Sequence, residues 1–561
     1  MGPGEGPPQD LDTPPFPRYL AAPQSRSEDV RLAARLGEQL KTLLIASAAV
    51  LALVAVGPAA ARTESAPALE RLLVGFERTP AASERAHVAR EGGQVLKAIP
   101  EANALAVRMN PRAAERLVAR GIASYVEADE LRYPLSLASA ELAPSLSNGL
   151  YGLVTTRATE VHSVGRSGAG IKACVADSGV DYTHPDIAPR YRAGIDEVSN
   201  DFNPTWGGDV HETHGTHVAG TVLAARGNGQ GVYGVAYGAD LYYARVLGYN
   251  AATGLVQGSS SDIMGGVRWL VDQGCKVVNL SLGGGRRMKT EERFYADMDK
   301  RGALVVAASG NDSATAVSYP AAYSTVLSVG AVDVNNARAS FSNTGAGLDI
   351  SAPGVLVLSS YPAGTGSESA VTAGSAPYRS FGMEYAGKTS AAGVSGALVD
   401  CGLGLAGQCP AAVAGNVALI QRGSISFAEK VQNATSAGAA AAIVYNNAPG
   451  DFVGTLGDPG AWIPAVSVSD TSGAALRGAV GTTVTVVNLA SSWEHSDGTS
   501  MATPHVSGVA ALVWSVNPSM SDEAVEDHLK ATAQDLGAAG YDTTFGYGLV
   551  NARAAVTRAG G

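Results

Sequence analysis

The sequence predicts an α/β fold in which a mostly parallel sheet is sandwiched by helices. From about Gly152, short β-branched apolar runs recur and end near Gly, Asp or Asn; they are GIKACVAD, LYYARVLG, CKVVNLSLG, ALVVAASGN and VLSVGAVD. Patterns typical of helices lie between them, such as GTHVAGTVLAA and SSDIMGGVRWLVDQG. Continuous apolar strands that alternate with helices are typical of a parallel sheet buried on both faces. In such sheets, functional side chains gather at the carboxyl ends of the strands.

Length and composition restrict the class of protein. The chain has 561 residues, which at about 150 residues per domain predicts three or four domains. Hydrophobic residues make up 46% of the chain, which is enough for large cores. The net charge is -11 and no long basic run occurs, so a nucleic-acid-binding surface is not expected. We expect a soluble monomer.

The first 61 residues have the pattern of a secretory leader. The stretch KTLLIASAAVLALVAVGPAAAR contains a basic residue, an apolar core over Leu43–Val56, and small residues before a cleavage point after Ala61. This core is shorter than the roughly 20 apolar residues that a membrane-spanning helix needs, so secretion is predicted. About forty mostly polar residues precede the core. A start near Val30 would explain them, and a membrane anchor with a cytoplasmic tail is the alternative.

Residues 62–147 are predicted to form a small α+β unit followed by a linker. The runs LERLLVGF, ANALAVRM and IASYVEADE read as strands, while SERAHVAREGG and NPRAAERLVARG read as helices that end at Gly. From about Tyr133 to Asn148 the chain is rich in Ala, Leu and Ser and has no clear periodicity. We expect this linker to be accessible to proteases.

The parallel-sheet pattern covers residues 148–363, stops, and resumes over residues 491–561. The intervening residues 364–490 carry strands of different composition (NVALIQRG, AAIVYNN, IPAVSVS and TTVTVVN) and the helices SFAEKVQNATSAG and DTSGAALRGAV. They are predicted to form an independent small α/β domain inserted into the larger one.

The four cysteines are predicted to behave differently from one another. Cys401 and Cys409 lie close together in DCGLGLAGQC, between turn-rich segments, and are expected to form a disulfide. Cys174 and Cys275 lie in apolar runs and are expected to be buried free thiols.

Three side chains of complementary chemistry stand at the ends of predicted elements. Asp177 ends the strand IKACVAD, His214 opens the helix HGTHVAGTV, and Ser500 opens the helix SMATPHVSG. In nucleophilic acyl transfer, an imidazole takes the proton of a hydroxyl while a carboxylate fixes the imidazole tautomer. Singly, each of the three has a plain explanation as a turn former or a helix cap. Their combination predicts a catalytic site for nucleophilic acyl transfer.

The motifs around these residues resemble the subtilisin family of serine proteases. VADSGVDYTHPD, HGTHVAG, NLSLGG, AASGN and GTSMATPHVSGVAAL follow in the family's order, and its Asp…His…Ser sequence is kept. The resemblance covers about Tyr151–Tyr361 and Trp493–Val556. It implies that Asp177 orients His214, that His214 is the general base, and that Ser500 is the nucleophile.

The same resemblance implies further site residues. Asn311, in AASGN, would donate its carboxamide N–H to the oxyanion together with the Ser500 backbone N–H. NLSLGG would be a strand that pairs with the substrate through Ser281, Leu282 and Gly283. Ser318 would lie at the base of the pocket for the residue before the cut, which implies an apolar or uncharged preference there.

A catalytic metal is not expected. HETHGTH lacks the i, i+4 histidine pair of a zinc protease, because Gly215 stands four residues after His211. The remaining nearby histidines are interpreted as structural; they are His184, His217 and His505. By resemblance, Asp186 and Asn228 match two calcium ligand positions, and a surface Asp with a loop Asn is the equally simple alternative.

Two further resemblances complete the prediction. The first α+β unit resembles the subtilisin propeptide, which assists folding, occupies the cleft and is then cut off. Residues 364–490 resemble the protease-associated domain of secreted subtilases, on the segments ALVDCGLG, NVALIQRGSISFAEKVQNATSAGAAAAIVYNN and IPAVSVS. The sequence therefore predicts a secreted, self-processed serine endopeptidase that acts on proteins or peptides and binds its own propeptide. An inactive binding protein and another acyl-transfer enzyme, such as an esterase or peptide ligase, are the alternatives.

Overall fold

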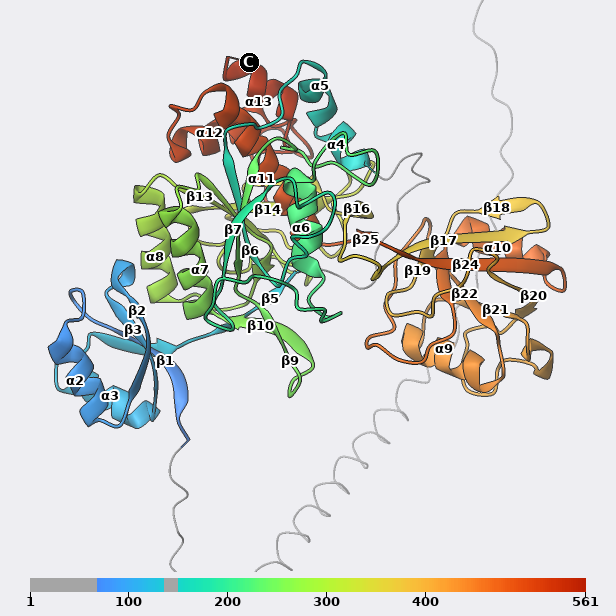
Figure 1. Ribbon diagram of the computed structural model, residues 1–561, viewed down its shortest axis with the longest axis horizontal. Coiled ribbons are helices and arrows are strands. Elements are labelled where there is room, and N and C mark those ends of the chain that lie inside the picture. Colours follow the sequence, from blue (N-terminus) through green and yellow to red (C-terminus); the bar gives the residue numbers. More distant parts are fainter. Residues whose placement is uncertain (1–67, 136–149, 561) are drawn as a thin grey trace, which may run out of the picture. The chain divides into compact units, whose positions relative to one another are not determined.

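The computed structural model describes residues 68–135 and 150–560 (Figure 1). The leader predicted for residues 1–61 and most of the predicted linker lie outside these residues. Within the described ranges, no helix combines the length and the apolar character needed to cross a membrane.

The N-terminal part, residues 68–135, is a four-stranded antiparallel sheet with two helices. Its strands stand in the order β2 (Gln94–Ile99), β3 (Ala104–Met109), β1 (Glu70–Gly75) and β4 (Tyr125–Ala128). Its helices are α2 (Ala82–Arg90) and α3 (Pro111–Ala119), and the 3-10 turn η1 (Pro100–Ala102) joins two strands. Asn110 caps α3 by accepting the backbone N–H groups of Arg112 and Ala113. The proline that follows suits the first helical turn, as NPRAAERLVARG predicts.

The largest part is built on a seven-stranded sheet in which every neighbouring pair is parallel. The strand order is β15 (Ile350–Pro353), β14 (Val326–Val332), β13 (Leu304–Ala308), β11 (Val277–Leu280), β6 (Lys172–Asp177), β8 (Asp240–Arg245) and β7 (Tyr191–Asp196). All five apolar runs predicted as strands lie in this sheet, so the predicted fold class is confirmed. The two edge strands, β15 and β7, were not predicted.

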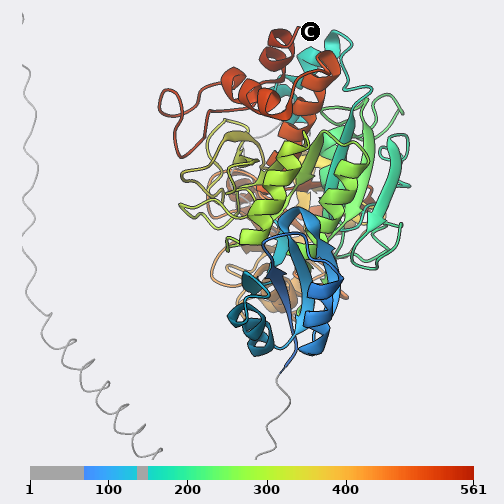
Figure 2. The ribbon, with the colours of Figure 1, turned by 90° about the vertical axis from the view of Figure 1, so that its left-hand side faces the viewer.

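Helices cover both faces of this sheet. Along β6, Ala173 and Val175 pack in one hydrophobic cluster, and Cys174 and Ala176 pack in another on the opposite face. The first cluster includes α6 (His214–Leu223) and α11 (Thr499–Val516), and the second includes α7 (Ser260–Asp272) and α8 (Lys289–Lys300). In Figure 1, α7 and α8 lie to the left of the sheet, and Figure 2, viewed from that side, shows them in front.

Shorter elements complete the large part. The helices are α4 (Tyr151–Thr155), α5 (Ala158–Ser163), α12 (Asp522–Thr532) and α13 (Ala552–Arg558). The strands are β9 (Gly248–Asn250), β10 (Leu255–Ser259), β12 (Leu282–Gly283), β16 (Val357–Ser360) and β25 (Trp493–Ser496), and β5 (Leu131–Pro134) from the end of the N-terminal part lies between β12 and β10. β16 and β25 pair antiparallel just before and just after residues 364–490. An insertion at this point therefore leaves the surrounding sheet continuous.

The inserted residues form a separate eight-stranded sheet. Its order is β18 (Ala376–Tyr378), β17 (Gly366–Ala373), β24 (Thr483–Ser491), β20 (Val394–Asp400), β21 (Val417–Gln421), β22 (Ala441–Tyr445), β23 (Ala465–Val468) and β19 (Phe381–Gly382). The helical elements are η2 (Ala411–Val413), α9 (Phe427–Ser436) and α10 (Asp470–Gly478). β17 and β24, the first and last strands of the insert in sequence, pair antiparallel, which brings the two ends of the insert together.

The cysteine pairing corrects one expectation. Cys401 and Cys409 form the predicted disulfide, but Cys174 and Cys275 also form one, so the expectation of free thiols there is wrong. Cys174 lies on β6 and Cys275 just before the neighbouring strand β11, with their Cα atoms 6.1 Å apart. Apolar neighbours in the sequence indicate burial, but they do not show which side chain lies opposite across 101 residues.

Candidate active site

Asp177 and His214 meet at the carboxyl edge of the large sheet. Asp177 is the last residue of β6 and His214 the first residue of α6. The Asp177 carboxylate accepts a hydrogen bond from His214 Nδ1 at 2.7 Å and a second from the Ser178 backbone N–H at 2.7 Å. Because Nδ1 carries the proton, His214 Nε2 is left as an acceptor, and it is buried without a partner. This is the tautomer that a general base needs.

Ser500 lies in the first turn of α11 and is fully buried. Its hydroxyl donates to the Ser281 carbonyl oxygen at 2.8 Å, so the structure does not bring Ser500 Oγ into a hydrogen bond with His214. The Ser500 carbonyl lacks its usual helical donor, because that residue is Pro504, which has no N–H. The Ser281 hydroxyl donates to this carbonyl instead, at 2.8 Å. Two reciprocal bonds therefore attach the first turn of α11 to Ser281.

Asn311 follows β13 and is held in one orientation by Thr499. Its Oδ1 atom accepts the Thr499 backbone N–H at 3.0 Å and the Thr499 hydroxyl at 2.8 Å. The amide Nδ2 atom consequently faces the site and donates to the carbonyl oxygen of Leu135 at 2.6 Å. The Ser500 backbone N–H donates to the same oxygen at 3.2 Å. The two predicted oxyanion donors thus hold one peptide carbonyl of this chain.

The segment that ends at Leu135 lies in the site as an added strand. β5 pairs antiparallel with β12, placing Pro134 opposite Leu282 and Tyr133 opposite Gly283, and it also pairs with β10. The Leu135 N–H donates to the Ser281 carbonyl at 3.3 Å. Ser281, Leu282 and Gly283 therefore contact an extended peptide through their backbones, which is the geometry of strand addition.

Comparison with known proteins identifies the scaffold of this site. Residues 168–401 and 473–548 match the model of the subtilase family. The chain belongs to the subtilase family. It is 37% identical over 335 residues to the alkaline protease of Alkalihalobacillus alcalophilus, covering 57% of this chain and 82% of that protein. It is 36% identical over 304 residues to subtilisin E of Bacillus subtilis, covering 53% of this chain and 74% of that protein.

Solved structures agree with this assignment. The psychrophilic subtilisin-like protease Apa1 from Pseudoalteromonas sp. AS-11 has 35% identity and a TM-score of 0.55, covering 72% of this subtilase and 96% of that chain. Fervidolysin from Fervidobacterium pennivorans has 22% identity and shares the fold with a TM-score of 0.56. The match covers 88% of this subtilase and 62% of that chain. Residues 383–476 match the PA domain model, so the subtilase carries a protease-associated domain within the inserted residues.

Ser318 and Gly283 of the subtilase lie beside the side chain of Leu135. Ser318 is buried, and its hydroxyl accepts a hydrogen bond from Asn343 Nδ2 at 3.3 Å. A methyl group at Gly283 would lie 2.9 Å from Leu135 Cδ1 and 3.4 Å from Ser318 Cβ. Leu135 therefore occupies a pocket to which Gly283 contributes open space.

A larger side chain at Gly283 is expected to narrow this pocket. In a Gly283→Val variant, cleavage after leucine should lose about 10- to 100-fold in kcat/KM, and cleavage after alanine should lose much less. The measurement is kcat/KM on two peptides that differ only at the residue before the cut. Gly285→Val is the matched control, since a methyl group there would contact nothing within 4 Å. Equal losses on both peptides would show that Gly283 does not line the pocket.

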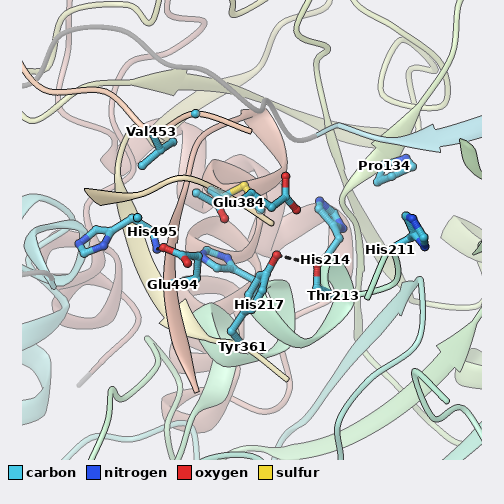
Figure 3. A pocket seen from close by; sticks show the side chains of 14 residues that line it. Pro134, His211, Thr213, His214, His217, Tyr361, Glu384, Val453, Glu494 and His495 are labelled. Atoms are coloured by element: carbon cyan, nitrogen blue, oxygen red, sulfur yellow. Dashed lines mark hydrogen bonds between the residues drawn. The ribbon is translucent and has the colours of Figure 1, made fainter. Parts of the chain in front are cut away.

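A cavity of about 190 Å³ adjoins His214 (Figure 3). Its lining comes from the large part, from the insert and, through Pro134, from the N-terminal part; it includes His211, Thr213, His217, Tyr361, Glu384, Val453, Glu494, His495 and Met501. The Thr213 hydroxyl donates to the Tyr361 hydroxyl at 2.7 Å, as Figure 3 shows. Burial raises the pKa of Glu384, raises that of Glu494 to about 7, and lowers that of His217 to about 3. The protease-associated domain thus borders the space beside the proposed general base.

The other histidines predicted as structural are bound to backbone carbonyl oxygens. The pairs are His184 with Ser492 at 2.9 Å, His217 with Val357 at 2.9 Å, and His505 with Met501 at 2.9 Å. His211 bonds to Asp209 and stacks on Tyr249. Over residues 68–135 and 150–560, no group of three or more His, Cys, Asp or Glu side chains is arranged to hold a metal.

The residues considered for calcium do not fit that ion. The Asp186 carboxylate is fully buried and faces hydrogen-bond donors: Asn228 Nδ2 at 2.5 Å, Trp493 Nε1 at 2.7 Å, the Val232 N–H at 3.2 Å and the Ser360 hydroxyl at 3.3 Å. Calcium requires six to eight oxygen ligands, whereas three of these four donors are N–H groups. Asp186 is therefore explained as a buried carboxylate held by these donors, with Asn228 as an exposed loop residue that binds it, and the calcium expectation is not supported.

Sequence reasoning missed Leu135, the residue whose carbonyl oxygen accepts from the two predicted oxyanion donors, Asn311 Nδ2 and the Ser500 N–H. Leu135 carries no chemistry of its own and stands in a stretch that was interpreted as linker. The strand-like alternation of Leu131, Tyr133 and Leu135 is the one signal that could have suggested an extended peptide.

Proposed function

We propose that this subtilase is a secreted serine endopeptidase, made as a zymogen, that cuts its own chain between Leu135 and Ser136. The observation that carries the proposal is the position of the Leu135 carbonyl oxygen, which accepts hydrogen bonds from Ser500 N–H and Asn311 Nδ2. This oxygen would become the oxyanion if Ser500 attacked the adjacent carbon.

The chemistry follows from the geometry of the three side chains. The Ser500 hydroxyl first turns from the Ser281 carbonyl toward His214 Nε2, which takes its proton as Oγ attacks the Leu135 carbonyl carbon. Asp177 stabilises the resulting imidazolium through the bond to Nδ1. The tetrahedral intermediate collapses when His214 returns the proton to the leaving nitrogen of Ser136, and an acyl-enzyme remains. Water, activated by His214, then hydrolyses that ester and regenerates Ser500.

The N-terminal part is proposed to remain bound after this cut as an inhibitor. Glu127 accepts the backbone N–H groups of Lys289 and Thr290 at the start of α8, at 3.1 and 2.8 Å. Asp129 accepts the Ser261 N–H at the start of α7, at 2.9 Å. Each carboxylate satisfies backbone N–H groups at a helix N-terminus and interacts favourably with the positive end of that helix dipole. These two interactions stabilise the bound state of the N-terminal part.

The proposed domain organisation follows the sequence prediction with one revision. We keep a leader over residues 1–61, a catalytic domain in the two parts 148–363 and 491–561, and an inserted domain over 364–490. The propeptide, expected over 62–147 together with its linker, is proposed to end at Leu135. Secretion is supported by the leader pattern and by two disulfides, which are typical of oxidising compartments.

Self-processing at this bond predicts a single mature N-terminus. When the full chain is produced in a protease-deficient host, mass spectrometry of the secreted enzyme should find Ser136 as its first residue. The fragment ending at Leu135 should co-purify before it is degraded. A mature chain that begins elsewhere between Leu137 and Asn148 would contradict the assignment of Leu135. A chain that stays with the membranes and keeps its first 61 residues would contradict secretion.

A further inference from the structure

The side chain of Arg132, the fourth residue before the proposed cut, is buried in the large part of the molecule. Only 1% of its side chain is exposed, and the same holds for its ion-pair partner Glu291. Arg132 Nη2 donates to Glu291 Oε2 at 2.7 Å and to the Arg286 carbonyl oxygen at 3.0 Å. A propeptide residue thus enters a closed polar site on the protein that it inhibits.

The walls of this site are built around the Glu291 carboxylate. Glu291 stands in the first turn of α8. The Tyr323 hydroxyl lies 3.0 Å from Glu291 Oε2, and Tyr295, fully buried, lies beside Tyr323 with ring centroids 5.9 Å apart. A methyl group at Gly284 would lie 3.0 Å from Arg132 Nη1, so the missing side chain leaves room for the guanidinium to enter. We call this site, lined by Gly284, Arg286, Glu291, Tyr295 and Tyr323, the arginine pocket.

The register of β5 links the arginine pocket to the reaction. Arg132 pairs with Gly258 on β10, Pro134 pairs with Leu282 on β12, and Leu135 lies with its carbonyl between the oxyanion donors. Any substrate that follows the same strand path presents its fourth residue before the cut to this pocket. The pocket is therefore part of the substrate-binding surface once the propeptide has left.

Loss of the propeptide leaves the pocket with an unpaired carboxylate. In the empty pocket this carboxylate is open to water, but a substrate side chain that covers it again without supplying a positive charge would bury an unpaired charge, which is strongly unfavourable. A neutral side chain in the pocket would keep Glu291 unpaired, and an acidic one would repel it. One nitrogen, Arg132 Nη2, makes both the contact with Glu291 and the contact with the Arg286 carbonyl. Lysine carries the same charge, but an ammonium is more strongly hydrated than a guanidinium, so lysine loses more hydration on entering this buried site and is expected to rank below arginine.

We propose that the mature enzyme selects protein substrates with arginine four residues before the cut, and that Glu291 is the residue that imposes this choice. The inference rests on the proposed endopeptidase function and on the register that Leu135 defines. Together with the pocket for Leu135, it describes a preferred substrate of the form Arg-Xaa-Xaa-Leu.

The direct test uses the mature wild-type enzyme and internally quenched peptides built on Leu-Xaa-Tyr-Pro-Leu-Ser. Xaa is arginine, lysine, citrulline, methionine or glutamate. Citrulline has the shape of arginine without its charge, so it isolates the ion pair. Arginine is expected to exceed citrulline and methionine by about 10²-fold or more in kcat/KM, with lysine between them and glutamate lowest.

Variants identify the residue responsible. Glu291→Gln should reduce the ratio of kcat/KM for arginine over citrulline to within a few-fold of one. Glu292→Gln is the matched control, because Glu292 is the next residue of α8 but pairs with Arg287 on the surface, and it should keep the wild-type ratio. If Glu291→Gln fails to fold, Gly284→Ala serves instead, and its added methyl group should lower kcat/KM for the arginine peptide more than for an additional peptide with alanine at Xaa.

The possible outcomes distinguish failure of the arginine pocket from failure of the proposed endopeptidase function. Cleavage of all five peptides at equal rates, with cutting after leucine, would overturn the arginine pocket alone. Absence of cleavage of every peptide by a correctly folded mature protein would overturn the proposed endopeptidase function. An arginine preference that survives in Glu291→Gln would overturn the role of Glu291.

Discussion

Replacement of Ser500 by alanine is expected to leave the chain as an uncut precursor. The substitution removes the only atom proposed to attack Leu135, while His214, Asp177 and the oxyanion donors stay in place. A loss of about 10⁶-fold in kcat is expected, which is the magnitude known for loss of the nucleophile in subtilisin. Gel electrophoresis and N-terminal mass spectrometry should find a chain that begins near Arg62 and that hydrolyses no peptide substrate.

Ser515→Ala provides the matched control for this result. Ser515 lies on the same helix, α11, and its hydroxyl donates only to the Leu512 carbonyl of that helix. This variant should mature to Ser136 like the wild type. Should Ser500→Ala still acquire a Ser136 N-terminus in a protease-free host, the cut would be made by another enzyme and self-processing would be wrong. Addition of trace wild-type enzyme then tests whether the precursor can be cut in trans.

The core of the fold could be predicted because its strands carry an unambiguous signal. Five of the seven strands are short, apolar on both faces and bounded by turn residues, as a sheet covered by helices on both sides demands. The two strands that escaped prediction are the edges. β7 has only two fully buried residues out of six, and β15 has four residues and ends in Pro353. Edge strands have one neighbour and fewer apolar contacts, so their sequences resemble loops.

The candidate site also contains residues that the sequence could indicate and residues that it could not. Asp177, His214 and Ser500 could be proposed from the sequence because the motifs around them follow the order of the subtilisin family. The structure brings Asp177 and His214 into contact, while the Ser500 hydroxyl is bound to the Ser281 carbonyl. The strand that receives the peptide, Ser281 to Gly283, was expected only through the family resemblance of NLSLGG. Leu135 was not predicted, because its contacts with the site are backbone hydrogen bonds and its side chain carries no recognisable signal. The Cys174–Cys275 disulfide could not be predicted for a similar reason. The two cysteines are brought together only because the strands β6 and β11 are neighbours in the sheet.

The inserted domain contributes to the surroundings of the site without supplying any of the proposed catalytic side chains. Its ends are held by two antiparallel strand pairs, β16 with β25 and β17 with β24. Glu384 and Val453 from this domain line the cavity beside His214. The domain can therefore influence which substrates reach His214 while the sheet that positions Asp177 and Ser500 stays unchanged.

Replacement of Asn311 by leucine is expected to lower kcat by about 10²- to 10³-fold and to change KM little. This is the magnitude measured in subtilisin for loss of one oxyanion donor. Leucine branches at Cγ as asparagine does but has no N–H group for the oxygen of the bound carbonyl. The donor matters most when that oxygen gains negative charge, so the loss should fall on the chemical step. The measurement is kcat and KM of the mature enzyme on a peptide cleaved after leucine.

The leucine variant also removes the acceptor for Thr499, and a second variant separates the two effects. Asn311 Oδ1 accepts the Thr499 N–H and hydroxyl, so these bonds orient Nδ2 toward Leu135. Thr499→Val deletes the hydroxyl bond but leaves the Asn311 donor, and it should lower kcat less than about 10-fold, since a single neutral hydrogen bond contributes about 1 kcal/mol. A Thr499→Val loss as large as that of Asn311→Leu would mean that the orientation of the turn, rather than the donor, limits the rate. An unchanged kcat in Asn311→Leu would remove Asn311 from the oxyanion site, even though its Nδ2 atom lies 2.6 Å from the carbonyl oxygen.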